Sequence, residues 1–157
     1  MIFVTVGHQM PFDRLVRLID DWAAVHEEDV YAQIGEAAYR PQHIKCVNWL
    51  SPSEYEAKLN ECSGVVSHAG TGTIIQSLLR GKPILVVPRR SRLGETRNDH
   101  QVATAQKFSE RGNVLTAMDD DHFDREMAKL ASVTSVESIG HEAAPELLAA
   151  IKRFITQ

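Results

Sequence analysis

The sequence predicts an α/β domain in which a parallel sheet of about six strands is covered by helices on both faces. Two observations carry this prediction. Short β-branched runs alternate along the chain with longer segments of helical period, and such alternation is typical of a parallel sheet with helical crossovers. Several runs are also apolar at consecutive positions, as expected of central strands that are buried on both faces. The fold class is therefore doubly wound and Rossmann-like.

Six short runs are the candidate strands. They lie at residues 2–6, 30–34, 44–49, 64–68, 84–88 and 113–117. In sheets of this class, ligands bind outside the carboxyl ends of the strands. The loops after the first, fourth and fifth runs, "GHQMPF", "HAGTGT" and "RRSRLGETRNDHQ", are therefore where a site is expected.

Helices are expected between the strands. Apolar residues recur every three or four positions from residue 12 to residue 23, which predicts an amphipathic helix over 12–27. The stretch "SPSE" at 51–54 is a capping box with proline at the first helical position, and it predicts a helix that ends near residue 62. The remaining helices are expected over 73–80, 98–111, 120–131 and, as a terminal helix, 142–156.

Size and composition limit the function classes. The 157 residues, 17.5 kDa, predict one domain, residues 1–157. A net charge of −4 argues against nucleic acid as a partner, because nucleic-acid binding needs clustered Lys and Arg. Two distant cysteines indicate neither a zinc site nor a disulfide framework. No apolar run approaches the ~20 residues that cross a bilayer, so we expect a cytoplasmic protein without a membrane anchor of its own.

The glycine turns after the first and fourth runs leave two interpretations open. Gly7 and the stretch Ala69-Gly70-Thr71-Gly72-Thr73 each precede an expected helix. Two helix N-termini aimed at one crevice would suit a phosphate or diphosphate, with the threonine hydroxyls as further donors. Alternatively, the glycines only allow tight strand-to-helix turns. No Walker lysine, first-strand dinucleotide fingerprint or G-x-S-x-G elbow accompanies them.

Two other groups of polar residues raise functional questions. The run Asp119-Asp120-Asp121 resembles a metal-binding D-x-D motif, but it lies where a helix should begin, so N-capping is the favoured interpretation. His8, His68 and His100 fall in the three expected ligand loops. They make a polar crevice with proton-transfer groups plausible, but they do not identify a general base.

Three segments carry a resemblance to a known family. They are "MIFVTVGHQMPFDRLVRLID", "SHAGTGTIIQSLLRGKPILVVP" and "NDHQVATAQKFSERG". Together they resemble the family 28 glycosyltransferases, in particular small single-domain members equivalent to the C-terminal half of the MurG-type GlcNAc transferase. That group includes the catalytic subunit of the eukaryotic transferase that makes dolichol-linked chitobiose, and PssE-type subunits of bacterial exopolysaccharide assembly. The match runs from residue 1 to about residue 117.

The resemblance implies half of a GT-B fold that binds a UDP-sugar, with no other cofactor and no metal. Family members have an acidic residue for the ribose hydroxyls where this sequence has Gln76, which puts nucleotide affinity in question. The other residues that the resemblance places at the donor are Gly7 and His8 at the diphosphate or reaction centre, His68, Ala69, Gly70, Thr71 and Gly72 at the diphosphate and sugar, Asn98, Asp99, His100 and Gln101 at the sugar, and the backbone near Pro88 at the uracil.

The resemblance also implies an activity. It is inverting transfer of a sugar from a UDP-sugar to a lipid-linked saccharide, in exopolysaccharide or glycolipid assembly. His8 and Asp99 are the candidate general bases, unless the base lies on another polypeptide. A GT-B enzyme needs a second domain for the acceptor, so we expect a membrane-anchored partner subunit that recruits this chain to the inner face of the membrane. The alternative is a non-catalytic subunit that binds the sugar nucleotide or activates the transferase.

The donor sugar stays open. Relatives suggest UDP-GlcNAc, and the exopolysaccharide group suggests UDP-glucuronate, with galactose and glucose as further candidates. A glucuronate carboxylate could be bound bidentately by an arginine of the loop after the fifth run. The loop offers Arg89, Arg90, Arg92 and Arg97. Alternatively, these four arginines belong to a solvated, flexible loop.

Overall fold

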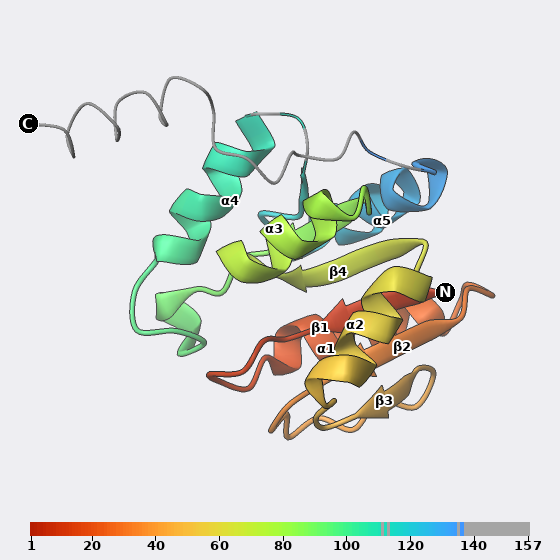
Figure 1. The fold of residues 1–157 in the computed structure, drawn as a ribbon. Coiled ribbons are helices and arrows are strands. Elements are labelled where there is room, and N and C mark those ends of the chain that lie inside the picture. The colour runs from red at the N-terminus through yellow and green to blue at the C-terminus, as the bar shows by residue number, and fades with distance from the viewer. Residues whose placement is uncertain (111, 113, 135, 137–157) are drawn as a thin grey trace, which may run out of the picture.

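A computed structural model describes residues 1–110, 112, 114–134 and 136 of the chain. These residues form one six-stranded parallel sheet with helices on both faces (Figure 1). The strands are β1 (Ile2–Thr5), β2 (Val30–Gln33), β3 (Lys45–Val47), β4 (Gly64–His68), β5 (Ile84–Val87) and β6 (Leu115–Thr116). The α-helices are α1 (Asp13–Ala23), α2 (Pro52–Glu61), α3 (Thr71–Leu79), α4 (His100–Glu110) and α5 (Phe123–Ser132), and the short 3-10 helices are η1 (Ser91–Leu93) and η2 (Asp120–His122).

The strand order places a site at the centre of the sheet. The order is β3-β2-β1-β4-β5-β6, and every pair of neighbours is parallel. The chain therefore builds outward from β1 in one direction, returns to the centre as β4, and then builds outward in the other direction. The point where the direction changes lies between β1 and β4, and ligands bind at such a switch point, beyond the carboxyl ends of the strands.

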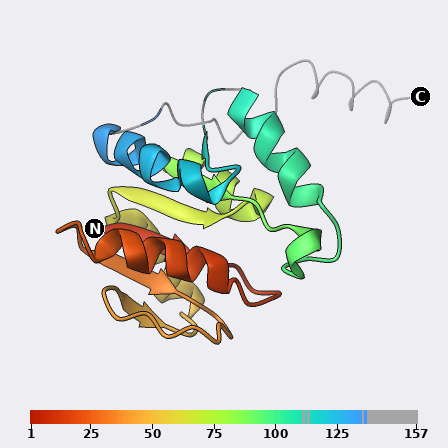
Figure 2. The same cartoon turned by 180° about the vertical axis from the view of Figure 1, so that it is seen from behind.

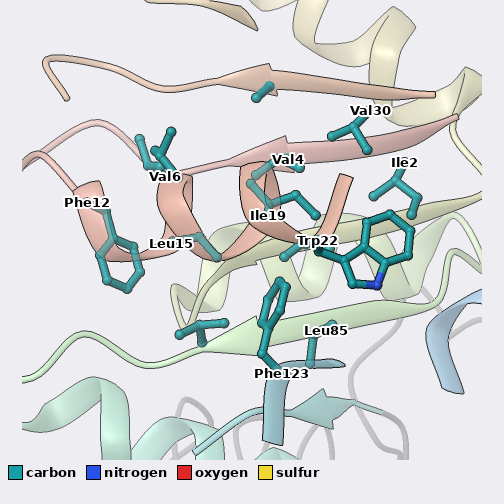
Figure 3. Close-up of a cluster of buried hydrophobic side chains, with 14 of the residues drawn as sticks. Ile2, Val4, Val6, Phe12, Leu15, Ile19, Trp22, Val30, Leu85 and Phe123 are labelled. Atoms are coloured by element: carbon teal, nitrogen blue, oxygen red, sulfur yellow. The ribbon is translucent and has the colours of Figure 1, made fainter. Parts of the chain in front are cut away.

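The two faces of the sheet are covered by different helices. Figure 1 shows α2, α3 and α4 on one face, and Figure 2, from behind, shows α1 and α5 on the other. Each layer has its own apolar core: one holds buried residues of α1 and α5, the other buried residues of α2, α3 and α4. Figure 3 shows the first core, where Leu15 and Ile19 of α1 and Phe123 of α5 lie with Val4 of β1. The predicted double layer is confirmed.

The element boundaries follow the sequence signals but shift at several ends. Helix α4 begins at His100 rather than at residue 98, and α5 begins at Phe123 rather than at residue 120. Helix α1 ends at Ala23 rather than at residue 27, and α3 begins at Thr71 rather than at residue 73. The sixth strand is reduced to Leu115–Thr116. The expected capping box of α2 is present, because Ser51 Oγ accepts from the Glu54 N–H while the Glu54 carboxylate accepts from the Ser51 N–H. The terminal helix expected over 142–156 lies outside the described residues.

The expected N-cap at residues 119–121 is wrong. Neither η2 nor α5 has a side-chain hydrogen bond at its cap. Instead, Asp119 accepts from Arg90 Nη2 at 2.8 Å and Asp120 from Arg14 Nη1 at 2.6 Å. A guanidinium is a stronger partner for a carboxylate than a neutral backbone N–H is. These two carboxylates therefore connect the segment at η2 to two other parts of the chain, the loop after β5 and α1.

No helix in the part of the chain that the structure describes combines the length and the apolar character needed to span a membrane.

Candidate functional site

A large cavity opens at the carboxyl ends of the central strands. Its volume is about 910 Å³, within the usual range of pockets that hold a small molecule or cofactor. Thr5 of β1, Gln33 of β2 and His68 of β4 line its floor, and residues of α2, α3 and α4 form the walls. The cavity therefore lies at the switch point of the sheet.

Most of the residues that the sequence pointed to line this cavity. They are Gly7, His8, His68, Ala69, Gly70, Thr71, Gly72, Thr73, Gln76, His100 and Gln101. Three expected residues, Pro88, Asn98 and Asp99, line neither this cavity nor the small one beside it. The loops after β1 and β4 and the start of α4 thus converge as expected, whereas the middle of the loop after β5 does not.

His68 occupies the space between the two glycine turns. A Cβ atom on Gly7 would lie 2.5 Å from His68 Cε1, and a Cβ atom on Gly70 would lie 2.9 Å from His68 Cδ2. Gly7 also has a φ of +78°, which side chains other than glycine rarely adopt. At Gly70, whose φ is −87°, the imidazole alone excludes a side chain. Gly72 differs, because nothing lies within 4 Å of its Cβ position.

The imidazole of His68 is held in its neutral form. Burial and the nearby positive charge of Arg89 lower its pKa from 6.5 to about 4. Its Nδ1 atom is buried and has no hydrogen-bond partner within the described residues. Desolvation disfavours the charged imidazolium, and a neighbouring cation disfavours it further. His68 therefore contributes a neutral polar ring to the floor of the cavity.

Arg89 is buried and bound to main-chain carbonyl groups. Only 4% of the surface of Arg89 is exposed to solvent. The guanidinium donates to the carbonyl oxygens of Val6 at 2.7 Å, Met10 at 2.6 Å, Pro11 at 2.7 Å and Glu95 at 3.1 Å. Burial lowers its pKa to about 10, so it stays charged at neutral pH. Arg89 thus ties the loop after β5 to the loop after β1.

A second arginine network holds the same loop from outside the cavity. Arg14 donates to both oxygens of Glu95, at 2.7 and 2.9 Å, and to the carbonyl oxygen of Pro88 at 2.8 Å. Glu95 also accepts from the Arg90 N–H at 2.9 Å, and Arg90 pairs with Asp119. The interpretation of 89–97 as a solvated, flexible loop is therefore wrong for Arg89 and Arg90. It agrees with the exposed positions of Arg92 and Arg97.

The first turn of α3 is the part of the cavity wall that is best suited to an anion. Gly70 is its N-cap and offers no side-chain acceptor, so the first N–H groups of the helix have no side-chain cap. Unpaired N–H groups and the positive end of the helix dipole favour an anion there. Thr71, Gly72 and Thr73 of this turn all line the cavity.

The second helix N-terminus at the cavity is that of α4 and not, as expected, that of α1. No residue of α1 lines the cavity. Five residues separate Gly7 from α1, and Asp13 in the first turn of that helix accepts from the Tyr39 N–H at 2.5 Å. The first turn of α4 lies at the cavity instead, through His100 and Gln101. A parallel sheet brings this turn to the same edge, and the length of the loop after β1 carries α1 away from it.

Asp99 is held outside the cavity. Its Oδ1 atom accepts from the Ser91 N–H at 2.8 Å, and this hydrogen bond lowers the pKa of the carboxyl group. Asn98 Oδ1 accepts from the His100 N–H at 3.3 Å, and the Pro88 carbonyl is bound by Arg14. These expected donor contacts are therefore used to shape the loop after β5. Gln101 has both roles, because it lines the cavity while its Oε1 accepts from the Arg89 N–H at 3.2 Å.

Two charged residues of the cavity were missed by sequence reasoning. Glu56 of α2 and Arg80, which caps α3, line it and form an ion pair at 3.2 Å. The signal was weak, because α2 precedes β4 and nothing in its sequence shows that it borders the crevice. His8, also at the cavity, packs its ring 4.5 Å from that of Trp49. Across the described residues, no three His, Cys, Asp or Glu side chains are grouped as a metal site would require.

Comparison with known sequences connects the fold to a family. Residues 1–136 match the family described as "Glycosyltransferase family 28 C-terminal domain". The chain is 30% identical over 124 residues to UDP-N-acetylglucosamine transferase subunit ALG13 of Mus musculus, covering 72% of this chain and 10% of the mouse protein. It is 26% identical over 138 residues to the subunit of the same name in Yarrowia lipolytica, covering 77% of this chain and 66% of that protein. The chain thus spans less than two thirds of each relative.

Solved structures show the same fold. A glycotransferase of kitacinnamycin matches with a TM-score of 0.64 and 21% identity, over 99% of this chain and 39% of that chain. An NMR structure of ALG13 matches with a TM-score of 0.63 and 18% identity, over 98% of this chain and 93% of that chain. The predicted Rossmann-like class, as one half of a GT-B fold, is confirmed.

Proposed function

Because the chain belongs to the family of glycosyltransferase family 28 C-terminal domains, we propose that it is the donor-binding catalytic subunit of an inverting UDP-sugar transferase. The observation that carries the proposal is the cavity of about 910 Å³ with the first turn of α3 in its wall. It offers one place for a diphosphate and enough room beside it for a nucleoside and a sugar. Relatives named as UDP-N-acetylglucosamine transferase subunits make UDP-GlcNAc the first donor to test.

The reaction places a demand that the α3 turn meets. The acceptor oxygen forms a bond to the anomeric carbon while the bond from that carbon to the UDP oxygen breaks, so negative charge builds on the leaving diphosphate. The N–H groups of residues 71–73 and the helix dipole stabilise this charge without reorganisation. Thr71 and Thr73 add hydroxyl donors. Transfer without a metal ion is part of the proposal.

A general base must take the proton of the acceptor hydroxyl when the new bond forms. Of the two bases proposed from the sequence, only His8 lines the cavity. Asp99 lies outside it, with its carboxylate bound to Ser91 and its pKa lowered, which weakens it as a base. His68, buried beneath the glycine turns, is better suited to support those turns. We therefore assign the base role to His8.

The acceptor half of the enzyme is proposed to lie on a partner. The relatives are named as subunits, and a GT-B transferase binds its acceptor with the other half of the fold. We propose a membrane-anchored partner that presents a lipid-linked saccharide, in exopolysaccharide or glycolipid assembly, and recruits this chain to the cytoplasmic face of the membrane. No nucleic-acid partner is proposed.

UDP-glucuronate is the less favoured donor. Arg89 uses its guanidinium on four carbonyl oxygens, and Arg90 pairs with Asp119. Neither guanidinium is therefore free to bind a sugar carboxylate bidentately. Arg92 and Arg97 line neither described cavity of the site.

A non-catalytic, nucleotide-binding subunit is the second candidate. The position of Asp99 favours it, because it leaves a single proposed base in the cavity. Both candidates bind a UDP-sugar, but only the first loses transfer when His8 is changed.

The test is a transfer assay with the co-expressed partner, a radiolabelled UDP-sugar and a lipid acceptor. We expect label in the lipid fraction only when both chains are present. Full activity of this chain alone would contradict the partner, and nucleotide binding with unchanged transfer by the His8→Ala variant would favour the second candidate.

A further inference from the structure

We propose that Glu56, Gln76 and Arg80 form a subsite for a vicinal diol, and that it binds the ribose of the donor nucleotide. The inference rests on the proposed function, because it takes the ligand to be a UDP-sugar. All three side chains line the main cavity. Glu56 is the only Asp or Glu, and Arg80 the only Lys or Arg, among the residues that line it in the described chain.

Arg80 organises the other two side chains. Its Nη2 atom donates to Glu56 Oε1 at 3.2 Å, and its Nη1 atom donates to Gln76 Oε1 and to the Gln76 carbonyl oxygen. Its Nε atom donates to Asn60 Oδ1 at 3.0 Å. The guanidinium is therefore used within the protein on each of its nitrogens. It places a carboxylate from α2 next to an amide from α3.

The groups left over are complementary to a diol. Within the described residues, Glu56 Oε2 accepts no hydrogen bond, and the Gln76 amide nitrogen donates none. The 2′-hydroxyl of a ribose can donate to the carboxylate oxygen, while the 3′-hydroxyl accepts from the amide. Acidic residues bind ribose hydroxyls in the same way at other nucleotide sites. The carboxylate that position 76 lacks is thus supplied by α2.

The distance along α3 fits a nucleotide. Gln76 lies five residues after Thr71, which begins the anion-binding turn. A rise of about 1.5 Å per residue separates them by roughly 7.5 Å along the axis. This is comparable to the span from a diphosphate to the ribose hydroxyls next to it. The nucleoside would then lie towards α2, and the sugar towards His8 and α4.

The test compares UDP with 2′-deoxy-UDP on the full chain, by calorimetry or amide shifts. We expect the wild type to bind UDP more tightly than the deoxy form. The Glu56→Gln variant should weaken UDP binding about tenfold, as for a charge-assisted hydrogen bond, and leave 2′-deoxy-UDP unchanged. Glu61→Gln is the matched control, since Glu61 is also exposed on α2 but does not line the cavity.

Each outcome decides between the claims. Equal affinity of the wild type for UDP and its deoxy form, or an equal loss for both ligands in Glu56→Gln, would overturn the subsite and leave the proposed function standing. A loss of the same size in Glu61→Gln would reduce the effect to helix charge and also overturn the subsite. Failure of the wild type to bind either nucleotide would overturn the proposed function together with the subsite.

Discussion

The ring of His68 fills the space that a side chain at Gly70 would need. The Cβ position of Gly70 lies 2.9 Å from His68 Cδ2 and closer still to Nε2. Because the φ of Gly70 is ordinary, glycine is required there for space and not for backbone freedom. The start of α3, where we propose that an anion binds, is therefore packed directly against the ring of His68.

Substitution of Gly70 by alanine should displace His68 and distort the first turn of α3. We expect the free energy of unfolding to fall by about 1–3 kcal/mol, as for overpacking of a tight site, and UDP affinity to fall with it. Urea unfolding and nucleotide titration measure the two effects.

Gly72→Ala is the matched control. Its Cβ position is free of contacts, and alanine is favoured over glycine in a helix by up to about 1 kcal/mol. Stability should therefore stay equal or rise. Equal destabilisation by Gly70→Ala and Gly72→Ala would contradict the role of His68.

The low pKa of His68 predicts a stability that depends on pH. An unfolded histidine titrates near 6.5, whereas folded His68 titrates at about 4, so the unfolded chain binds more protons between these values. Stability from this group is complete above pH 6.5 and is lost as the pH falls towards 4, by at most roughly 3 kcal/mol. NMR titration of the His68 ring measures its pKa directly. A midpoint near 6.5, or the same acid dependence in His68→Asn, would be inconsistent with this account.

Replacement of Arg89 by lysine should destabilise the loops after β1 and β5. The ammonium group keeps the charge but cannot serve four carbonyl oxygens at once. Buried carbonyls left without donors cost about 1–3 kcal/mol each, so we expect a loss of at least about 2 kcal/mol in urea unfolding. Arg97→Lys, an exposed position in the same loop, should leave stability unchanged. Unchanged stability of the Arg89→Lys variant would show that the four hydrogen bonds of the Arg89 guanidinium are dispensable.

The base assignment predicts different effects at His8 and Asp99. His8→Ala should lower kcat on the order of 100-fold or more, which is typical for loss of a general base, while UDP affinity is kept. Asp99→Asn should change kcat little, because an amide oxygen can still accept from the Ser91 N–H. The transfer assay with the partner measures both. The opposite order of effects would return the base role to Asp99.

Repeating patterns made the fold predictable. The strand runs and the capping box at 51–54 specify local structure, and the parallel sheet then brings the carboxyl ends of β1 and β4 together. Residues at those ends, such as His68 and Gly70, could therefore be placed at the site from the sequence.

Side-chain pairing between distant loops was not predictable. Arg89 gave no sign in the sequence that it would be buried against the Val6 carbonyl, and Asp120 resembled an N-cap until Arg14 was seen beside it. Such pairs join residues more than 70 positions apart, so their partners are set by tertiary structure alone. Glu56 was not predicted because nothing in the sequence of α2 shows that this helix borders the cavity.

The proposed function requires this cavity to bind a uridine diphosphate sugar at the first turn of α3. The most direct measurement follows backbone amide shifts while UDP, UDP-GlcNAc, UDP-glucose, UDP-galactose and UDP-glucuronate are titrated separately. We predict shifts centred on residues 68–73 and on Gln76, with UDP-GlcNAc the tightest of the sugars. No shift with any uridine nucleotide, or shifts that avoid α3, would contradict the claim.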